Sequence, residues 1–388
     1  MRAAVMTARG QLSVVDDVDI EEPGQGEVLV EVRWCSVCHS DLHALDGETL
    51  PPLPCVLGHE TSGVVRALGP GVDSLAAGDH VVLSMIGPCG RCRQCLRGTP
   101  VACTRAGGPG GLTPDGSTRL SRGGERVWRA LRVGGFAELA VVRQEAAVRI
   151  APDVPLDLAC VLGCAVQTGY GAVSNIAGVR PGDTVGVVGL GAVGVAAVQA
   201  ARLAGASAVI GIDPLPSRRE LAEKLGATVT LAPEEADADA VRAWTGDHLL
   251  DAIVDTVSTP ATIRQAAGMT GRRGAVVLVG VGSLDRELGV VTADIVMNQK
   301  RILGCYLGNC VPNRDIPALV DLWRQGRLDL DAMVTTRREL ADLGEAFEDV
   351  RRGRGLRTAV AVAPGGVTES ARPADGDPGN QVRRSLDS

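Results

Sequence analysis

The pattern of hydrophobic positions changes near the middle of the chain. In the first 140 or so residues, short apolar runs such as Glu27–Val32 and Gly63–Leu68 are separated by Gly, Pro and Asp turns. Short apolar runs bounded by turn residues predict strands. We therefore expect the N-terminal part to be a mainly β domain.

From about Thr184, apolar runs of strand length alternate with Ala-rich stretches of helical length. The predicted strands are Val185–Leu190, Ala208–Ile212, Ala252–Val257 and Ala275–Val281, and a helix is expected over Val195–Ala204. Such alternation predicts βαβ units around a parallel sheet that is buried on both faces. The predicted fold class is α/β, with a doubly wound parallel sheet beside the mainly β domain.

Beyond that sheet, Ile302–Leu307 and Thr358–Val362 are predicted strands and Ile316–Gln325 a predicted helix. Residues 363–388 are rich in Gly, Pro, Asp and Ser and nearly lack apolar residues, which predicts a disordered tail. No internal repeat is found.

Composition excludes several classes of partner. The chain has 388 residues and a formal net charge of -7, so it lacks the basic surface that binds nucleic acid or an anionic membrane. No apolar stretch approaches the roughly 20 residues of a membrane span, and the N-terminus runs directly into a predicted strand. We expect a cytoplasmic protein with neither nucleic acid nor membrane as partner.

Eleven cysteines are many for a reducing compartment. Five lie in apolar surroundings and are expected to be packed in the core: Cys35, Cys55, Cys160, Cys305 and Cys310. Four others, Cys89, Cys92, Cys95 and Cys103, fall within fifteen residues rich in Gly and Pro. Such spacing favours a closed tetrahedral zinc site over disulfides or idle thiols.

A second group of possible metal ligands is scattered along the chain: Cys38, His59 and Cys164. Spacing alone leaves packing or solvation as the alternative for each of them. Asp41 and Glu60 are carboxylates close in sequence to these residues. A zinc-binding histidine usually donates its other N–H to such a group, which favours a metal site.

A glycine-rich motif follows the strand that ends at Val188 and opens the Ala-rich helix. Its glycines, Gly189, Gly191 and Gly194, allow a tight turn and close approach of a pyrophosphate to the helix N-terminus. Asp213 ends the next strand, where a carboxylate accepts from the ribose hydroxyls and repels a 2′-phosphate. NAD is therefore favoured over NADP, although Arg218 and Arg219 could instead meet a phosphate.

In this order, the motifs resemble those of the zinc-dependent medium-chain alcohol dehydrogenase family. The shared motifs are Cys-His-Ser-Asp-x-x-His from Cys38, Gly-His-Glu from Gly58, the four-cysteine lobe, Gly-Cys-x-x-x-Thr-Gly-Tyr-Gly from Gly163, the glycine-rich motif and Leu-Arg-Thr from Leu356. The resemblance runs from Ala3 to about Val362. Residues 104–133 resemble the long connecting loop of the dimeric, liver-type and formaldehyde-dehydrogenase-like branch, which implies a homodimer.

The resemblance implies a domain order and a role for each matching residue. A GroES-like catalytic domain would span 1–165, with the zinc lobe at 87–104; a Rossmann domain would span 166–305, and 306–362 would return to the first domain. Two zinc ions are implied, a structural one in the lobe and a catalytic one on Cys38, His59 and Cys164. Glu60 would be an acidic neighbour that can reach the metal, Asp41 the partner of His59, and Ser40 and His43 the proton relay. Among the implied cofactor contacts, Thr168 would meet the nicotinamide and His39 and Arg357 the pyrophosphate. Val193 and Arg218 are further implied cofactor contacts.

The implied reaction is reversible hydride transfer between NAD and a medium-sized primary or secondary alcohol, such as an aromatic or terpenoid one. The alcohol proton would leave through Ser40 and the ribose to His43. Met85 and Val281 align with substrate-lining positions. Ser36 stands where the family usually has glycine, and Gly107 where glutathione-dependent formaldehyde dehydrogenases carry an arginine, which disfavours that substrate.

Three alternatives remain open at this point. The chain could be an aldehyde dehydrogenase that uses a thiol other than glutathione. It could hold NAD tightly and recycle it with an external acceptor. From a different class, it could be a non-catalytic scaffold that binds NAD and zinc.

Overall fold

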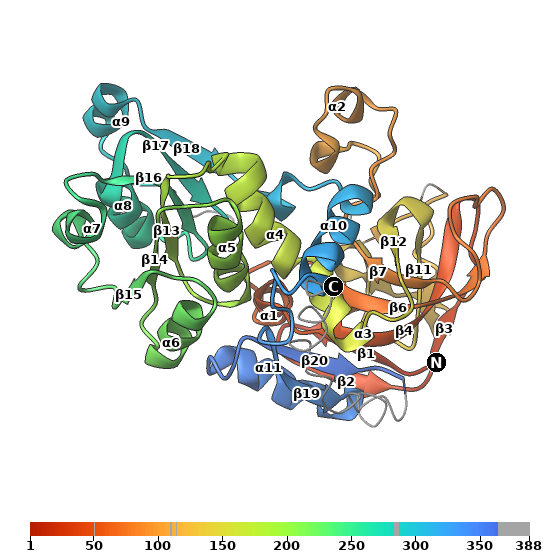
Figure 1. Cartoon of the computed structure of the whole chain (residues 1–388). Coiled ribbons are helices and arrows are strands. Elements are labelled where there is room, and N and C mark those ends of the chain that lie inside the picture. Colours follow the sequence, from red (N-terminus) through yellow and green to blue (C-terminus); the bar gives the residue numbers. More distant parts are fainter. Residues whose placement is uncertain (50, 109–110, 114, 283–286, 364–388) are drawn as a thin grey trace, which may run out of the picture.

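The computed structural model describes residues 1–49, 51–108, 111–113, 115–282 and 287–363. Two parts stand side by side, each built around its own sheet (Figure 1). The predicted tail beyond Ala363 lies outside the described residues. Among the described residues, no single helix has the length and apolar character of a membrane span, and one bent pair, Leu156–Gly163 with Ala165–Ala177, meets that test only jointly.

The mainly β part contains a seven-stranded sheet that joins both ends of the chain. Its strands are ordered β12-β7-β6-β4-β20-β19, with β11 also paired to β4. The bounds are β4 Glu27–Ser36, β6 Glu60–Leu68, β7 His80–Leu83, β11 Leu139–Arg143, β12 Ala147–Ile150, β19 Val334–Glu339 and β20 Arg357–Ala361. Because β20 pairs antiparallel with β4, Arg357 is brought beside the N-terminal ligand motif.

Smaller elements complete this part. A four-stranded sheet has the order β10-β5-β1-β2, and a three-stranded sheet the order β3-β8-β9. The bounds are β1 Ala3–Ala8, β2 Gln11–Val15, β3 Val18–Ile20, β5 Cys55–Val56, β8 Leu120–Arg122, β9 Glu125–Arg126, β10 Trp128–Arg129, α1 His39–Leu45, α2 Arg93–Leu96, α3 Leu156–Ala159, α10 Pro312–Arg324 and α11 Leu343–Arg351. Strands β8, β9 and β10 lie in the segment expected to be a connecting loop, because its backbone pairs with β3 and β5 far away in sequence.

The second part is a six-stranded parallel sheet flanked by helices, as the alternating pattern predicts. The strand order is β15-β14-β13-β16-β17-β18. The bounds are β13 Thr184–Val188, β14 Ala208–Ile212, β15 Val229–Leu231, β16 Leu250–Asp255, β17 Thr270–Leu278, β18 Arg301–Gly304, α4 Ala165–Gly171, α5 Ala192–Leu203, α6 Pro216–Lys224, α7 Ala238–Thr245, α8 Pro260–Met269 and α9 Thr292–Asn298. All residues of β13 and β14 are buried, which explains their continuous apolar sequence.

The predicted strand ends are less accurate than the strands themselves. β16 and β17 stop two and three residues before Val257 and Val281, and both valines are substantially exposed. Apolar residues at the carboxyl edge of a parallel sheet need not belong to the strands, since loops there face the ligand crevice. Hydrophobicity alone therefore extended both predictions too far.

Candidate active site

Four side chains from three separated motifs converge on one site. Ligand atoms of Cys38, His59, Glu60 and Cys164 all lie within 4.8 Å of one another, and the four residues are buried. Cys38 precedes α1, His59 precedes β6 and Cys164 precedes α4. The structure thus brings together the trio that spacing alone left doubtful.

His59 has the orientation expected of a metal ligand. Its Nδ1 lies 3.2 Å from Asp41 Oδ1, while its Nε2 is buried and has no hydrogen-bond partner among the described residues. Asp41 Oδ1 also accepts from the backbone N–H of Gly58, at 2.9 Å. A buried polar atom needs a partner, and a cation held with two thiolates would provide one.

The two thiols supply suitable donor chemistry. A hydrogen bond from Cys164 holds the pKa of Cys38 well below its ordinary value against the effect of burial, and the charges of Arg357 and His59 act in the same direction. Thiolate sulfur and imidazole nitrogen are the ligands that zinc prefers. Two sulfurs and one nitrogen leave a fourth tetrahedral position, so the residues present fit a catalytic zinc.

Asp41→Asn is expected to weaken catalytic zinc binding by about 10- to 100-fold, because the amide no longer fixes the ring of His59 as a carboxylate does. Competition with a chromogenic chelator measures the affinity. Asp115→Asn is a matched control, since that carboxylate bonds Thr113 and Arg119 far from the cluster in sequence. Equal affinity in Asp41→Asn and the parent protein would contradict the assigned role.

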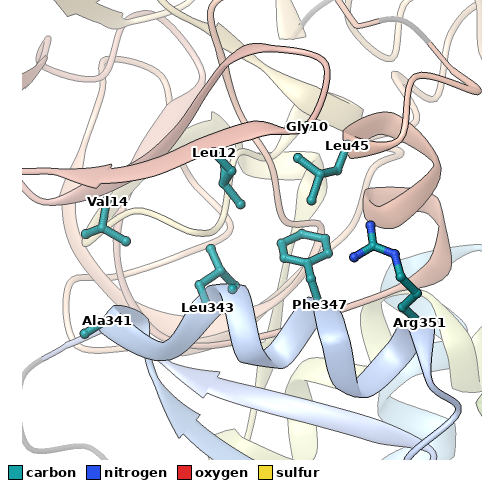
Figure 2. Close-up of a pocket in the computed structure, with 9 residues that line it drawn as sticks. Gly10, Leu12, Val14, Leu45, Ala341, Leu343, Phe347 and Arg351 are labelled. Atoms are coloured by element: carbon teal, nitrogen blue, oxygen red, sulfur yellow. The ribbon is translucent and has the colours of Figure 1, made fainter.

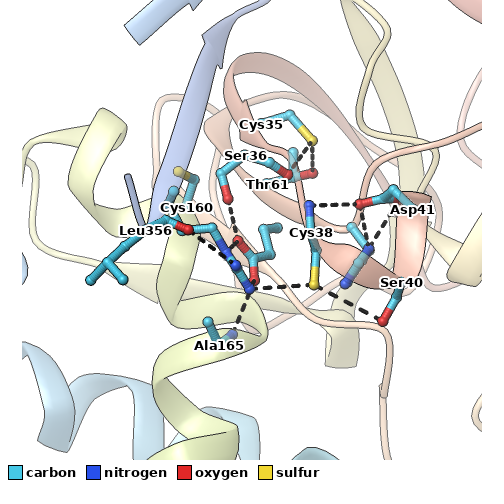
Figure 3. Close-up of polar contacts among 12 residues, drawn as sticks. Cys35, Ser36, Cys38, Ser40, Asp41, Thr61, Cys160, Ala165 and Leu356 are labelled. Carbon is cyan, nitrogen blue, oxygen red and sulfur yellow. Dashed lines mark hydrogen bonds and ion pairs between the residues drawn. The ribbon is translucent and has the colours of Figure 1, made fainter. Parts of the chain in front are cut away.

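Glu60 is held by four donors. Its Oε2 accepts from Arg357 Nε at 2.9 Å and from the Ser36 hydroxyl, and its Oε1 accepts from Arg357 Nη2 and Ala165 N, both at 3.1 Å. Figure 3 shows these contacts converging beside the Cys38 sulfur. Burial raises the pKa of Glu60, and the adjacent Arg357 charge opposes that rise.

Two residues predicted to contact the pyrophosphate lie at this cluster. Burial works to lower the pKa of Arg357, but Glu60 and Cys38 outweigh it and raise that pKa above the ordinary range. Nη2 of Arg357 lies 3.4 Å from Cys38 Sγ. Burial, with the Arg357 charge, lowers the pKa of His39 to about 4, so this imidazole is neutral near pH 7 and would meet a phosphate as an N–H donor.

The predicted relay residues lie on α1. Ser40 and His43 are three residues apart and so share a helix face. Ser40 Oγ lies 4.0 Å from Cys38 Sγ, which places it beside the metal ligands. His43 Nε2 lies 3.9 Å from Glu48 Oε2, and Glu48 was not among the predicted residues.

The glycine-rich motif forms the turn that its sequence predicts. Gly189 has a φ of +82°, a conformation that favours glycine, and its N–H donates to Ile212 at 2.8 Å. A Cβ on Gly194 would lie 1.8 Å from the Gly189 oxygen, so only glycine fits there. Gly191 precedes α5, and Val193 lies in its first turn.

Asp213 lies at the end of β14, against the same turn. Its Oδ2 accepts from Leu190 N at 2.8 Å, and Arg218 Nη1 lies 3.8 Å from that carboxylate. Arg219 Nη1 instead donates to the carbonyls of Asp213 and Pro214. Arg218 Nε is buried and has no hydrogen-bond partner among the described residues.

Thr168 carries another unsatisfied buried group. It lies on α4, and its Oγ1 has no hydrogen-bond partner among the described residues. Gly169 packs so closely on α5 that a Cβ there would lie 2.3 Å from the Val193 oxygen. This packing links the cysteine motif to the glycine-rich loop and suits the predicted nicotinamide contact of Thr168.

The four-cysteine lobe projects from the mainly β part (Figure 1). The sulfurs of Cys89, Cys92, Cys95 and Cys103 all lie within 4.8 Å of one another. Backbone N–H groups of Cys95 and Thr104 lower the pKa of Cys92 to about 5. Four converging sulfurs fit a closed structural zinc site.

The remaining cysteines follow the packing prediction with one exception. Cys35, Cys55, Cys160 and Cys310 are buried, whereas Cys305 is half-buried. Of the two predicted substrate-lining residues, Met85 is buried and Val281 is 58% exposed.

A cavity of about 370 Å³ lies away from the metal ligands, between β2, α1 and α11. Leu12, Leu45, Leu343 and Phe347 point into it, with Arg351 at one end (Figure 2). It contains none of the predicted site residues. This cavity therefore does not mark the active site.

Two contacts of Glu60 were missed by sequence reasoning. Arg357 is 297 positions away, and no local pattern signals such a pair. Ser36 was noticed only as a departure from glycine. Ser36 lies directly opposite Glu60 on the neighbouring strand. Only the register of the two strands shows this.

Comparisons with known proteins identify the family of this chain. A family described as "Alcohol dehydrogenase GroES-like domain" matches residues 24–153, and one described as "Zinc-binding dehydrogenase" matches residues 192–325. An "NDMA-dependent alcohol dehydrogenase" of Amycolatopsis methanolica is 36% identical, over 92% of this chain and 98% of that protein.

Two solved structures share the architecture. An alcohol dehydrogenase zinc-binding domain protein from Burkholderia ambifaria has a TM-score of 0.88 and 38% identity, over 93% of this chain and 98% of its own. Benzyl alcohol dehydrogenase from Acinetobacter calcoaceticus has a TM-score of 0.87 and 34% identity, over 93% of this chain and 99% of its own. The predicted GroES-like and Rossmann fold class is confirmed, and the chain belongs to the zinc-dependent medium-chain alcohol dehydrogenase family.

Proposed function

We propose that this protein is an NAD-dependent alcohol dehydrogenase that acts on a medium-sized primary or secondary alcohol through a zinc ion on Cys38, His59 and Cys164. The observation that carries the proposal is the convergence of these three ligands, with the His59 Nε2 left without a hydrogen-bond partner in the part of the chain that the structure describes. A scaffold protein would have no need of a three-ligand site with one position open.

Different residues of the chain would serve metal binding, proton transfer and cofactor binding around the substrate. A bound zinc would supply Lewis-acid activation of the alcohol oxygen. Ser40, whose hydroxyl lies beside the Cys38 thiol, would take the alcohol proton, and His43 on the same helix face would pass it towards solvent. Thr168 would orient the nicotinamide, while the N-terminus of α5 would hold the pyrophosphate.

The direct test is cofactor reduction by the purified full-length protein with a panel of alcohols, together with metal analysis. We expect an increase in reduced nicotinamide with at least one medium-sized alcohol, and one zinc for each ligand cluster. A protein that carries both metals but oxidises no alcohol in the panel would contradict the proposal.

A second candidate function is favoured by one observation. The relative from Amycolatopsis methanolica is named for its dependence on NDMA, and an enzyme that keeps NAD bound would need such an added compound as acceptor. Spectroscopic detection of cofactor in the purified protein, with turnover that requires an acceptor and not free NAD, would favour this mode. A protein purified without cofactor would favour the first candidate function, in which NAD binds and leaves in each turnover.

Cofactor choice gives a second prediction. We expect kcat/KM for NAD to exceed that for NADP by at least about tenfold, because the buried Asp213 carboxylate would repel a 2′-phosphate. Asp213→Ser should lower the ratio of kcat/KM for NAD to kcat/KM for NADP. Adding Arg218→Gln to that variant should raise the ratio again. Steady-state kinetics with both cofactors measure this ratio. A parent enzyme that prefers NADP would contradict the role assigned to Asp213.

We also propose that two copies associate through the edge of the parallel sheet. β18 is one of the two edge strands of this sheet, and Val296, Met297 and Tyr306, near it in sequence, are 67%, 75% and 48% exposed. An edge with exposed apolar neighbours favours pairing with another chain. Met297→Asp should shift the mass measured by light scattering towards the monomer, whereas Trp244→Asp on α7 should not; equal masses would contradict this interface.

A further inference from the structure

The Glu60 carboxylate is close enough to the predicted metal ligands to compete with substrate. One of its oxygens lies within 4.8 Å of the ligand atoms of Cys38, His59 and Cys164. Carboxylate oxygen is also among the protein donors that bind zinc. A small movement of this side chain would therefore fill the coordination position that an alcohol must occupy.

Four hydrogen bonds restrain the carboxylate where it lies. The two Arg357 nitrogens, the backbone N–H of Ala165 and the Ser36 hydroxyl together donate four hydrogen bonds to Glu60. A carboxylate has about four lone-pair sites. Glu60 can reach the metal only by giving up at least one of these donors.

The register of β4 with β6 sets the position of Ser36 relative to Glu60. It ends β4 and lies directly opposite Glu60, the first residue of β6. Residues directly opposite on antiparallel strands project to the same face at short distance. The side chain of Ser36 is fully buried, and its hydroxyl is directed at the carboxylate (Figure 3).

Ser36 lies in regular strand, so its backbone does not require glycine there. A glycine at this position could not donate a hydrogen bond. Serine therefore supplies Glu60 with one charge-assisted donor that glycine would lack.

We propose that Ser36 is a positioning residue that restrains Glu60 and so keeps the open metal position free for substrate. The inference rests on the proposed function, because it takes the metal to lie on Cys38, His59 and Cys164. It concerns which ligand fills the fourth position, and it can be measured without turnover.

The test uses the full-length protein with cobalt(II) in place of zinc, since the visible spectrum of cobalt reports its ligands. Imidazole is titrated as a probe of the open position. In Ser36→Gly and Ser36→Ala, Glu60 should occupy that position part of the time. The spectrum should shift without added ligand, and the apparent Kd for imidazole should rise by up to about tenfold. That limit is reached if the loss of one charge-assisted hydrogen bond lets Glu60 occupy the position most of the time.

Three comparisons separate this effect from a general loss of structure. Ser36→Thr keeps the hydroxyl and should restore both the spectrum and the imidazole affinity. Ser62→Ala removes another buried serine on β6, which bonds the Leu156 carbonyl at 2.6 Å, and should leave both unchanged. Cobalt bound in the four-cysteine lobe provides an internal reference, because its bands should be identical in every variant.

The outcomes distinguish this inference from the proposed function. Ser36→Gly with the parent spectrum and the parent imidazole affinity would overturn the inference. A parent protein that binds metal only in the four-cysteine lobe would overturn both proposals. Weakened imidazole binding in Ser36→Gly, in a protein that oxidises no alcohol, would support the role of Ser36 and overturn the proposed reaction.

Discussion

Replacing Cys38 by Ser or His59 by Ala is expected to lower kcat/KM for alcohol oxidation by at least about a thousandfold. Lewis-acid stabilisation is worth several kcal/mol, and each 1.36 kcal/mol corresponds to a factor of ten in rate. His59→Ala also leaves the buried carboxylate of Asp41 without its imidazole partner. Cofactor reduction measures the rate, and metal analysis should show that the zinc of this cluster is lost while that of the lobe remains.

Cys160→Ser is the matched control for this experiment. Its thiol is buried like that of Cys38, but it contacts the carbonyl oxygen of Asp157 at 3.2 Å and belongs to neither sulfur cluster. Its kcat/KM should stay within a few-fold of the parent value, consistent with an ordinary packing change. Activity of Cys38→Ser or His59→Ala equal to that of Cys160→Ser would contradict the assigned metal site.

The second large effect is expected in the four-cysteine lobe. Cys92→Ser should lower the melting temperature by roughly 10 °C, because structural zinc binding contributes directly to folding free energy. Cys92 Sγ lies 3.5 Å from Cys95 Sγ and 3.8 Å from Cys103 Sγ, at the centre of the cluster. Calorimetry on the parent and the variant measures the change.

The reaction itself should survive this loss. The lobe sulfurs and the catalytic cluster share no residue, so kcat of Cys92→Ser measured well below its melting temperature should remain within about tenfold of the parent value. Cys305→Ser, a half-buried thiol outside both clusters, controls for removal of a sulfur. An unchanged melting temperature in Cys92→Ser would contradict a structural zinc in the lobe.

Local sequence was sufficient for features whose residues are close together. The four sulfurs of the lobe lie within fifteen residues, so their convergence follows from the turns between them. The glycine-rich turn is equally local, because Gly189 needs a positive φ and Gly194 has no room for a side chain. Strands β13 and β14 were recognisable because both are buried throughout and therefore continuously apolar.

Tertiary structure decided everything that depends on pairing between distant strands. β20 lies beside β4, which brings Arg357 to Glu60 across 297 positions, and the register of β4 with β6 sets Ser36 opposite Glu60. Hydrophobic pattern shows which face of a strand is buried, but not which distant strand will pair with it or in which register. By itself, then, the sequence determined the two domain types, the sulfur lobe and the cofactor turn, whereas only the tertiary structure decided how the carboxylate beside the catalytic ligands is held.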